Sequence, residues 1–194
     1  ISVALSSIKV IKKAFQTIYF LPYVTNTLAV GMVFMALFDK TEYTDGLFNM
    51  VIKLFGGNAV DFINGPYWAK MLVLCVYTVW VVMPFKILIL TSALASVKQD
   101  YYNAAKVDGT SKWRIFTRIT VPLLSPMIAY VVITGFIGGF KEYTSIIGIF
   151  GDSMADGQLY TMVGFIYDAL PDAFYGEASA AALILFAIIF AVTM

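Results

Sequence analysis

The chain has 194 residues, of which 60% are hydrophobic and 13% are charged. Soluble domains carry about 25% charged residues, so this composition and a mean hydropathy of +0.83 exclude an ordinary soluble domain and indicate an integral membrane protein. The net charge at pH 7 is only +1, which gives no overall electrostatic attraction to nucleic acid.

The residue types also exclude the common kinds of catalytic and metal site. The chain contains no histidine, the usual metal ligand and general base. Its single cysteine, Cys75, lies in an apolar stretch and is read as a small buried side chain. No glycine-rich loop is followed by the lysine of a phosphate-binding motif, so we do not expect the chain to bind ATP. We expect no catalytic residue, no metal and no cofactor.

Apolar runs divide the chain into segments that could cross a bilayer, for which about 20 apolar residues are needed. The predicted runs are residues 1–7, 19–38, 68–97, 127–150 and 178–194, separated by polar stretches. The third long run is interrupted by Lys141 and Glu142. Because the first run is too short to cross alone, we expect a fragment of a longer protein. The predicted fold class is all-α, a polytopic transmembrane helix bundle.

The distribution of basic residues predicts which connections face the cytoplasm, because cytoplasmic loops are enriched in lysine and arginine. Segments 9–13 and 98–118 together hold eight Lys and Arg residues. Segment 39–66 holds only Lys40 and Lys53, and segment 151–177 holds none. The sequence therefore predicts that residues 100–126 are cytoplasmic and that the other two connections lie outside.

Residues 100–126 keep a helical pattern although they are polar and charged. Gly109 follows a short run of helix-forming residues and predicts a left-handed helix stop. Thr110 and Ser111 can cap a second helix that begins at Lys112. We therefore expect a short helix, a glycine turn and a second helix.

The second helix has an apolar stripe formed by Trp113, Phe116 and Ile119, so we expect an amphipathic helix that lies across a membrane face. Pro122 and Pro126 are expected to end it and to start the next element. A basic loop held at an anionic inner membrane surface would have the same composition, so composition alone leaves that alternative open.

The order of residues in this stretch resembles the EAA loop of ABC importer permeases, the element that couples such permeases to a separate ATPase. The matching positions are Asn103, Ala104, Ala105, Asp108, Gly109, Phe116, Ile119, Pro122 and Pro126. Asn103 replaces the leading glutamate of the family pattern, and its amide can still form hydrogen bonds. The resemblance implies ATPase coupling by Asn103, Ala104, Ala105, Asp108, Gly109, Trp113 and Phe116. It also implies one permease domain, residues 1–194, with residues 100–126 as its cytoplasmic coupling loop.

Two further stretches, residues 20–22 (Phe-Leu-Pro) and 176–180 (Gly-Glu-Ala-Ser-Ala), resemble the carbohydrate-uptake branch of these permeases. The resemblance implies a six-span subunit of which this fragment lacks the first span and most of the second. The implied partners are an ABC ATPase dimer, a second permease chain for which the resemblance favours a different sequence, an extracytoplasmic solute-binding protein, the lipid bilayer and a small sugar or polyol. No nucleic acid is expected, and the implied location is the cell membrane of a prokaryote.

Polar residues within the apolar runs are candidates for the substrate path, because transporter sites tend to lie near the bilayer midplane. The candidates are Asn26, Thr134, Lys141, Glu142 and Tyr143. Thr134, Gly138, Lys141 and Ser145 are spaced to form one helical stripe. Interhelical hydrogen bonds and ion pairs explain the same residues equally well.

The charged residues in the apolar runs are also compatible with a different class of function, ion-coupled transport. Lys86, Lys141 and Glu142 could act as a charge relay in an ion-coupled secondary transporter that needs no ATPase. An intramembrane enzyme is disfavoured, because no nucleophile has an adjacent base.

Overall fold

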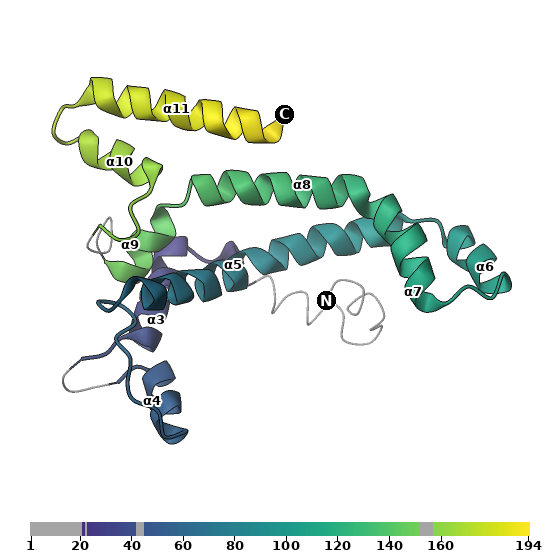
Figure 1. Cartoon of the computed structure of the whole chain (residues 1–194), viewed down its shortest axis with the longest axis horizontal. Coiled ribbons are helices and arrows are strands. Elements are labelled where there is room, and N and C mark those ends of the chain that lie inside the picture. The colour runs from purple at the N-terminus through teal and green to yellow at the C-terminus, as the bar shows by residue number, and fades with distance from the viewer. Residues whose placement is uncertain (1–20, 22, 42–44, 152–156) are drawn as a thin grey trace. The chain divides into compact units, whose positions relative to one another are not determined.

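The computed structural model describes residue 21 and residues 23–41, 45–151 and 157–194 (Figure 1). The features predicted at residues 1–20, at Pro22 and at the acidic residues Asp152 and Asp156 lie outside the described residues. Within the described part, helices are joined by turns and loops, and Lys40 and Asp45 form an isolated antiparallel bridge. The predicted all-α class is confirmed.

The helices follow one another in the order α3 (Thr27–Phe38), α4 (Leu47–Leu54), α5 (Tyr67–Ser96), α6 (Gln99–Val107), α7 (Lys112–Ile115), the π-helical turn η1 (Phe116–Thr120), α8 (Val121–Phe140), α9 (Thr144–Phe150), α10 (Met162–Ala169) and α11 (Tyr175–Thr193). Three continuous helical stretches of the described chain are long and apolar enough to cross a membrane, namely Tyr67–Ser96, Lys112–Phe140 and Tyr175–Thr193. The transmembrane helix bundle expected from the sequence is therefore confirmed.

The helices belong to two compact units. One contains Tyr23 and residues 82–135, and the other contains the described residues of 24–81 and 136–194. Helices α5 and α8 each contribute residues to both units. Outside the expected spans, the polar connection 39–66 contains α4 and the connection 151–177 contains α10.

The apolar run 19–38 is not one continuous helix, as its uncharged length had suggested. The backbone leaves the helical conformation at Thr25 and Asn26, and α3 begins at Thr27. The Asn26 side-chain oxygen accepts hydrogen bonds from the backbone N–H groups of Leu28, at 2.9 Å, and Ala29, at 3.4 Å. An asparagine side chain competes in this way for the free donors at a helix start, which explains the break.

The prediction that Pro122 and Pro126 end the second helix of the 100–126 stretch is wrong. The helix continues from Lys112 to Phe140, and Pro126 lies inside α8. The wide turn η1 comes just before Pro122, where the Val121 N–H donates to the Phe116 carbonyl five residues earlier. A π-helical turn changes the hydrogen-bond register locally, so the chain passes the proline without a helix end.

The apolar run 127–150 was expected to form one span, but α8 ends at Phe140 and α9 begins at Thr144, so the helix is broken at the charged residues Lys141 and Glu142. The expected stripe of Thr134, Gly138, Lys141 and Ser145 is therefore wrong beyond Gly138. Helical spacing cannot align residues across a break in the helix.

The core of the second unit is aromatic. The Phe34 ring meets the Tyr77 ring edge-on at a centroid distance of 5.1 Å, and it lies 5.5 Å from the ring of Trp80. The Tyr77 hydroxyl donates to the Thr27 carbonyl oxygen at 3.0 Å. Tyr77 therefore ties α5 to the beginning of α3 through both its ring and its hydroxyl.

Helices α3 and α9 approach so closely that only glycine fits at their crossing. A Cβ atom built on Gly31 would lie 2.6 Å from the backbone carbonyl carbon of Gly148. Small residues allow membrane helices to pack backbone against backbone. The contact fixes α9, and with it the α8–α9 break, against α3.

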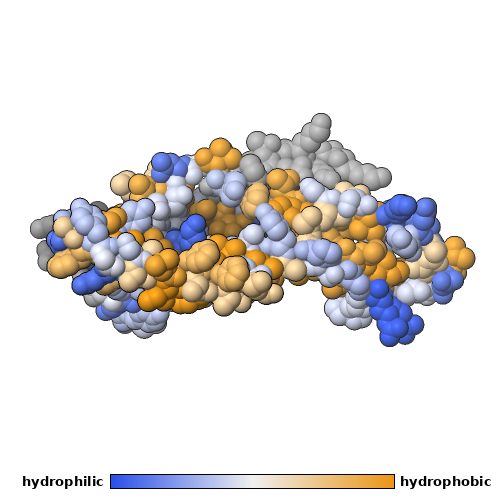
Figure 2. All heavy atoms as spheres, turned by 90° about the horizontal axis from the view of Figure 1, so that it is seen from above, coloured by the Kyte–Doolittle hydropathy of each residue, from blue (hydrophilic) through white to orange (hydrophobic). Residues whose placement is uncertain are grey.

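Outside these contacts the helices present apolar side chains to their surroundings. Figure 2 shows such side chains spread over the molecular face that it draws. On α11, Leu183, Ile184, Phe186 and Phe190 are all exposed. A helix that is apolar on its outer face is typical of a membrane span.

We expect Gly31→Val to lower stability, because the new side chain would collide with the backbone of α9, which cannot move aside as a side chain can. Overpacking costs about 1–3 kcal/mol where side chains can adjust, so the loss is expected at or above the upper end of that range. Thermal unfolding of the purified protein in detergent measures it. Ala36→Val is the matched control, because Ala36 is exposed on the same helix; equal losses in both variants would contradict the close-packing explanation.

Candidate functional site

The 100–126 stretch has the helix–turn–helix form predicted from its sequence. At the end of α6 the Thr110 N–H donates to the Ala105 carbonyl at 3.0 Å, and the Gly109 N–H donates to the Lys106 carbonyl at 3.1 Å. Gly109 has a φ of +66°, in the left-handed region. This pair of bonds with a left-handed glycine is the Schellman helix end, so the predicted stop at Gly109 is confirmed.

Two side-chain hydrogen bonds stabilise this stretch: one caps its second helix and the other joins the two helical segments. Ser111 caps α7, since its hydroxyl oxygen accepts a hydrogen bond from the Arg114 N–H at 3.4 Å. The hydroxyl groups of Tyr102 on α6 and Thr120 on η1 are hydrogen-bonded at 3.3 Å, and Thr120 is buried. The pair therefore forms one defined shape rather than a loose loop.

The residues expected to contact a partner lie mostly on the surface of this helix pair. Asn103, Ala104, Asp108, Gly109, Trp113 and Phe116 are exposed, whereas Ala105 is buried. The Trp113 side chain is 73% exposed and its ring centroid lies 5.8 Å from that of Phe116. Because Ala105 is buried, its side chain is not available to a partner at this surface.

Sequence reasoning missed one residue of this surface. Val107 is 89% exposed at the end of α6, next to the turn at Gly109. An isolated β-branched apolar residue in a polar helix was the available signal. Val107 and Trp113 give the turn an exposed apolar surface on each of its two sides.

The residues predicted for the substrate path do not form one cluster. Asn26 uses its side chain to cap α3. Thr134 donates its hydroxyl hydrogen to the Tyr130 carbonyl of its own helix at 2.7 Å. Thr134 belongs to the first unit, whereas Lys141, Glu142 and Tyr143 belong to the second.

Lys141, Glu142 and Tyr143 form the break between α8 and α9 and have different surroundings. The Glu142 carboxylate accepts a hydrogen bond from the Ser145 N–H at 3.2 Å, which caps α9. Tyr143 stacks on Tyr167 of α10 with ring centroids 4.6 Å apart and planes at 4°. Lys141 is exposed. In the part of the chain that the structure describes, the ion pair found joins Lys53 and Asp45, so Lys141 and Glu142 do not neutralise one another.

Glu142 also lines a cavity of about 460 Å³ in the second unit. Its other lining residues come from the first half of α5, from the ends of α8 and α9 that meet at the break, and from segment 158–161. The polar ones are Tyr67, Thr78, Gln158, Tyr160 and Thr161. A site of aromatic faces, hydroxyls, an amide and a carboxylate can hold a polar small molecule by hydrogen bonds while covering its apolar surface. These polar residues were not predicted, because they are distant in sequence and carry no shared motif.

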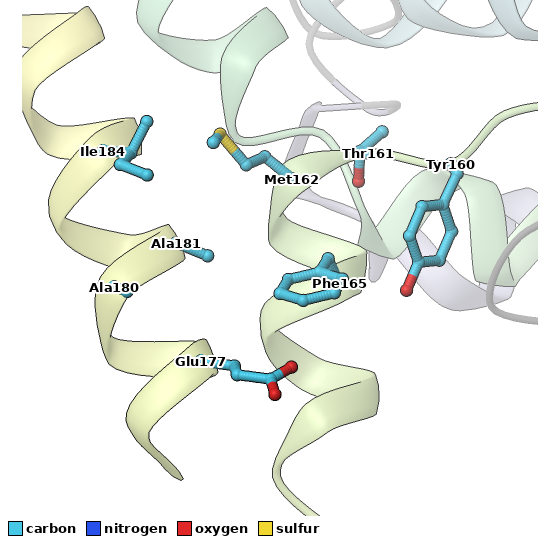
Figure 3. A pocket seen from close by; sticks show the side chains of 8 residues that line it. All are labelled: Tyr160, Thr161, Met162, Phe165, Glu177, Ala180, Ala181 and Ile184. Carbon is cyan, nitrogen blue, oxygen red and sulfur yellow. The ribbon is translucent and has the colours of Figure 1, made fainter. Parts of the chain in front are cut away.

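Tyr160 and Thr161 separate this cavity from a second one of about 570 Å³ between α10 and α11. Figure 3 shows that Glu177 extends from α11 toward α10, where the Phe165 ring lies. Desolvation, and next the negative charge of Asp168, raise the pKa of the Tyr160 hydroxyl. Both causes favour the protonated hydroxyl beside the Asp168 carboxylate.

Comparison with known proteins gives a consistent set of relatives. The family model described as binding-protein-dependent transport system inner membrane component matches residues 1–194. The lactose transport system permease protein LacF of Rhizobium radiobacter is 30% identical over 134 residues, which are 68% of this chain and 43% of the relative. The arabinooligosaccharides transport system permease protein AraP of Halalkalibacterium halodurans is 29% identical over 182 residues, 93% of this chain and 56% of the relative.

A solved structure has the same fold. A chain of a bacterial alginate ABC transporter, solved in complex with a periplasmic protein that holds an alginate pentasaccharide, matches with a TM-score of 0.84 at 20% identity. The match covers 99% of this chain and 66% of that one. The chain spans about half the length of the curated relatives it matches.

The cap at Asn26 can be tested by stability alone. We expect Asn26→Ala to destabilise the protein by about 1 kcal/mol, because loss of a capping side chain costs roughly that much. Asn26→Ser should retain most of the stability, since serine also accepts hydrogen bonds from the first backbone donors. Thermal unfolding in detergent compares the two variants; an equally low unfolding temperature in both would argue against the capping role.

Proposed function

Because the chain belongs to the family of binding-protein-dependent transport system inner membrane components, we propose that it is the membrane-spanning subunit of an ATP-binding-cassette importer for a sugar or related polyol. The observation that carries the proposal is the family match along residues 1–194. The names of its relatives, which transport lactose and arabinooligosaccharides, support the substrate class. Its proposed location is the cell membrane of a prokaryote.

The 100–126 loop is the proposed contact with the ATPase, which would be a separate dimeric subunit. Three features support this role: a defined helix pair, a left-handed glycine at its turn, and exposed apolar side chains at Val107 and Trp113. Exposed apolar surface on an otherwise polar element is typical of an interaction site. The second helix of the pair continues into α8 without a break, so a movement of the loop would be passed directly to a membrane helix.

The remaining partners follow from the same proposal. A solute-binding protein would deliver the sugar to the outer connections, which contain α4 and α10. A second permease, in the carbohydrate-uptake branch a different chain, would complete the path. The solved relative with a substrate-loaded periplasmic protein supports an arrangement of this kind.

For the substrate, the proposed contacts are the residues around the α8–α9 break. Lys141 is exposed there, and Glu142 faces a cavity lined with hydroxyl, amide and aromatic groups. Sugars present hydroxyl groups for hydrogen bonds and ring faces for aromatic contact, so this lining suits a polyol. Asn26 and Thr134 are less suited, because their side chains are already bonded to the backbone.

The ion-coupled alternative is not favoured. The matched family is described as binding-protein-dependent, and the relatives LacF and AraP are permeases of sugar transport systems. Lys86 lies in the other unit from Lys141 and Glu142, and a Cβ atom built on Gly135 would be 2.8 Å from its Nζ atom. Among the described residues, the ion pair found joins Lys53 and Asp45 and includes none of these three charges.

Gly109→Val tests the coupling role. A left-handed conformation costs an ordinary residue about 1–2 kcal/mol, so the turn at Gly109 should rearrange while the membrane helices stay folded. No atom lies within 4 Å of the position that a Cβ would take, so any effect comes from the backbone. We expect the complex to hydrolyse ATP without sugar uptake into vesicles.

The matched control for this experiment is Gly109→Asn, since asparagine adopts the left-handed conformation more readily than other residues do. It should retain much of the uptake. Uptake unchanged in Gly109→Val would contradict the coupling role.

Lys141→Ala tests the substrate path. We expect weaker sugar uptake, by a factor of about 10 if one hydrogen bond to a charged group is lost, with the ATPase still assembled and active. Uptake kinetics in vesicles provide the measurement, and Glu142→Gln serves as the companion variant, because glutamine can still cap α9. An unchanged substrate affinity in both variants would remove these residues from the path.

A further inference from the structure

The apolar residues of helix α4 lie on its exposed side, which is unusual for a helix that faces water. Leu47, Met50, Val51, Leu54 and Phe55 recur at helical spacing and are between 44% and 85% exposed. Surface helices of soluble domains turn such a stripe inward. We call these five side chains the α4 apolar face.

The opposite side of α4 is attached to the protein by specific contacts. The fully buried Asn49 side chain makes two hydrogen bonds with the backbone of Val60, both of 2.9 Å. The Phe48 ring stacks on Phe38 at a centroid distance of 3.9 Å. Ile52 packs against the aromatic core. These contacts fix which way α4 is turned, so the exposure of its apolar face does not result from a loosely held helix.

The end of α4 is equally well defined. The Gly57 N–H donates to the Ile52 carbonyl at 2.9 Å, the Gly56 N–H donates to the Lys53 carbonyl at 3.0 Å, and Gly56 has a φ of +80°. This is the same type of helix end as at Gly109. Leu54 and Phe55, the most exposed members of the apolar face, are therefore held in place at the last turn.

The contacts also place α4 at one end of the membrane-spanning helices of its unit. Phe38 is the last residue of α3, and Val60 lies shortly before Tyr67, the first residue of α5. In the view of Figure 1, α4 is drawn at the level of this N-terminal end of α5, with its axis running across that of α5. Tyr67 and Trp68 are both exposed at the start of α5. Tyrosine and tryptophan are enriched where membrane helices pass through the lipid–water interface.

The lipid-facing surface of α5 begins at the same level. Trp68, Leu72 and Val76 follow one another at spacings of four residues and are all exposed, so they form one apolar stripe. Such a stripe on a membrane-spanning helix faces lipid unless another chain covers it. If lipid covers this stripe, it reaches the end of the helix beside which α4 is attached.

We propose that α4 is an interfacial helix whose apolar face inserts into the outer leaflet of the membrane. The occupant is lipid rather than protein, because the face contains no group that can form a hydrogen bond, whereas protein interfaces are on average only slightly more than half apolar. The ion pair of Lys53 with Asp45 and the exposed Lys40 lie beside it, where headgroups would be. The inference requires the membrane location but does not depend on the transported substrate.

A spin label on the α4 apolar face tests the proposal. The assembled transporter, with Cys75→Ser to remove the native thiol, carries a nitroxide at Leu54→Cys and is placed in nanodiscs of phosphatidylethanolamine and phosphatidylglycerol. Collision with oxygen, which concentrates in lipid, is compared with collision with a water-soluble nickel complex. We expect the label about 5–10 Å below the phosphate level, the depth typical of interfacial helices.

The matched control is Asn58→Cys, because Asn58 is exposed only four residues further on and is polar; its label should meet the nickel complex freely. Equal nickel access at both positions would overturn the proposal. Shielding of Leu54→Cys from both reagents, or shielding that appears only with the solute-binding protein, would assign the face to a protein partner and would also overturn it. If Leu54→Cys fails to assemble, Phe55→Cys provides the same reading at the neighbouring position.

Discussion

The need to satisfy backbone hydrogen-bonding groups at helix ends is the constraint on which the rest of this structure depends. In a bilayer, water cannot fill this role, and each unpaired group costs several kcal/mol. In the apolar runs, Asn26 at the start of α3 and Glu142 at the start of α9 meet the need. In the connections, Ser111 and Thr161 cap α7 and α10 in the same way. Where a span is broken, a polar side chain therefore stands at the break.

This constraint explains why a polar residue in an apolar run can either cap a helix or contact a substrate. Glu142 both caps α9 and lines a cavity, so its structural role places a carboxylate where a substrate could meet it. Asn26 caps a helix without lining either described cavity. A broken membrane helix needs a polar residue to cap the new helix end. The same residue can then be accessible to a substrate that passes the break.

Two features keep parts of the structure rigid in different ways. One is the close contact of Gly31 with Gly148, and the other is the helix pair of residues 100–126. The glycine contact brings α3 and α9 together as densely as two backbones allow, which holds the α8–α9 break in place. The loop is held by a left-handed glycine, a serine cap and the Tyr102–Thr120 hydrogen bond, and its apolar side chains remain exposed. A stiff element with an exposed apolar surface is suited to pass on a movement made by a partner.

The sequence by itself determined the class of the protein, the span of α5, the stop at Gly109 and the cap at Ser111. These features depend on local chemistry: the length of an apolar run, the conformational freedom of glycine and the reach of a serine hydroxyl. The sequence pattern also indicated the family that the comparison with known proteins shows.

Only the tertiary structure decided that α3 begins at Thr27, that a π-helical turn carries the chain past Pro122, and that Glu142 shares a cavity with Gln158 and Tyr160. It also decided that the apolar face of α4 points away from the protein. Each of these depends on which of several possible hydrogen-bond acceptors or packing partners a residue finds. For the α3 start and the π-helical turn the choice is between neighbouring acceptors a few residues apart. For the cavity and the α4 face it is made by contacts between segments distant in the chain, which periodicity and spacing along one segment do not contain.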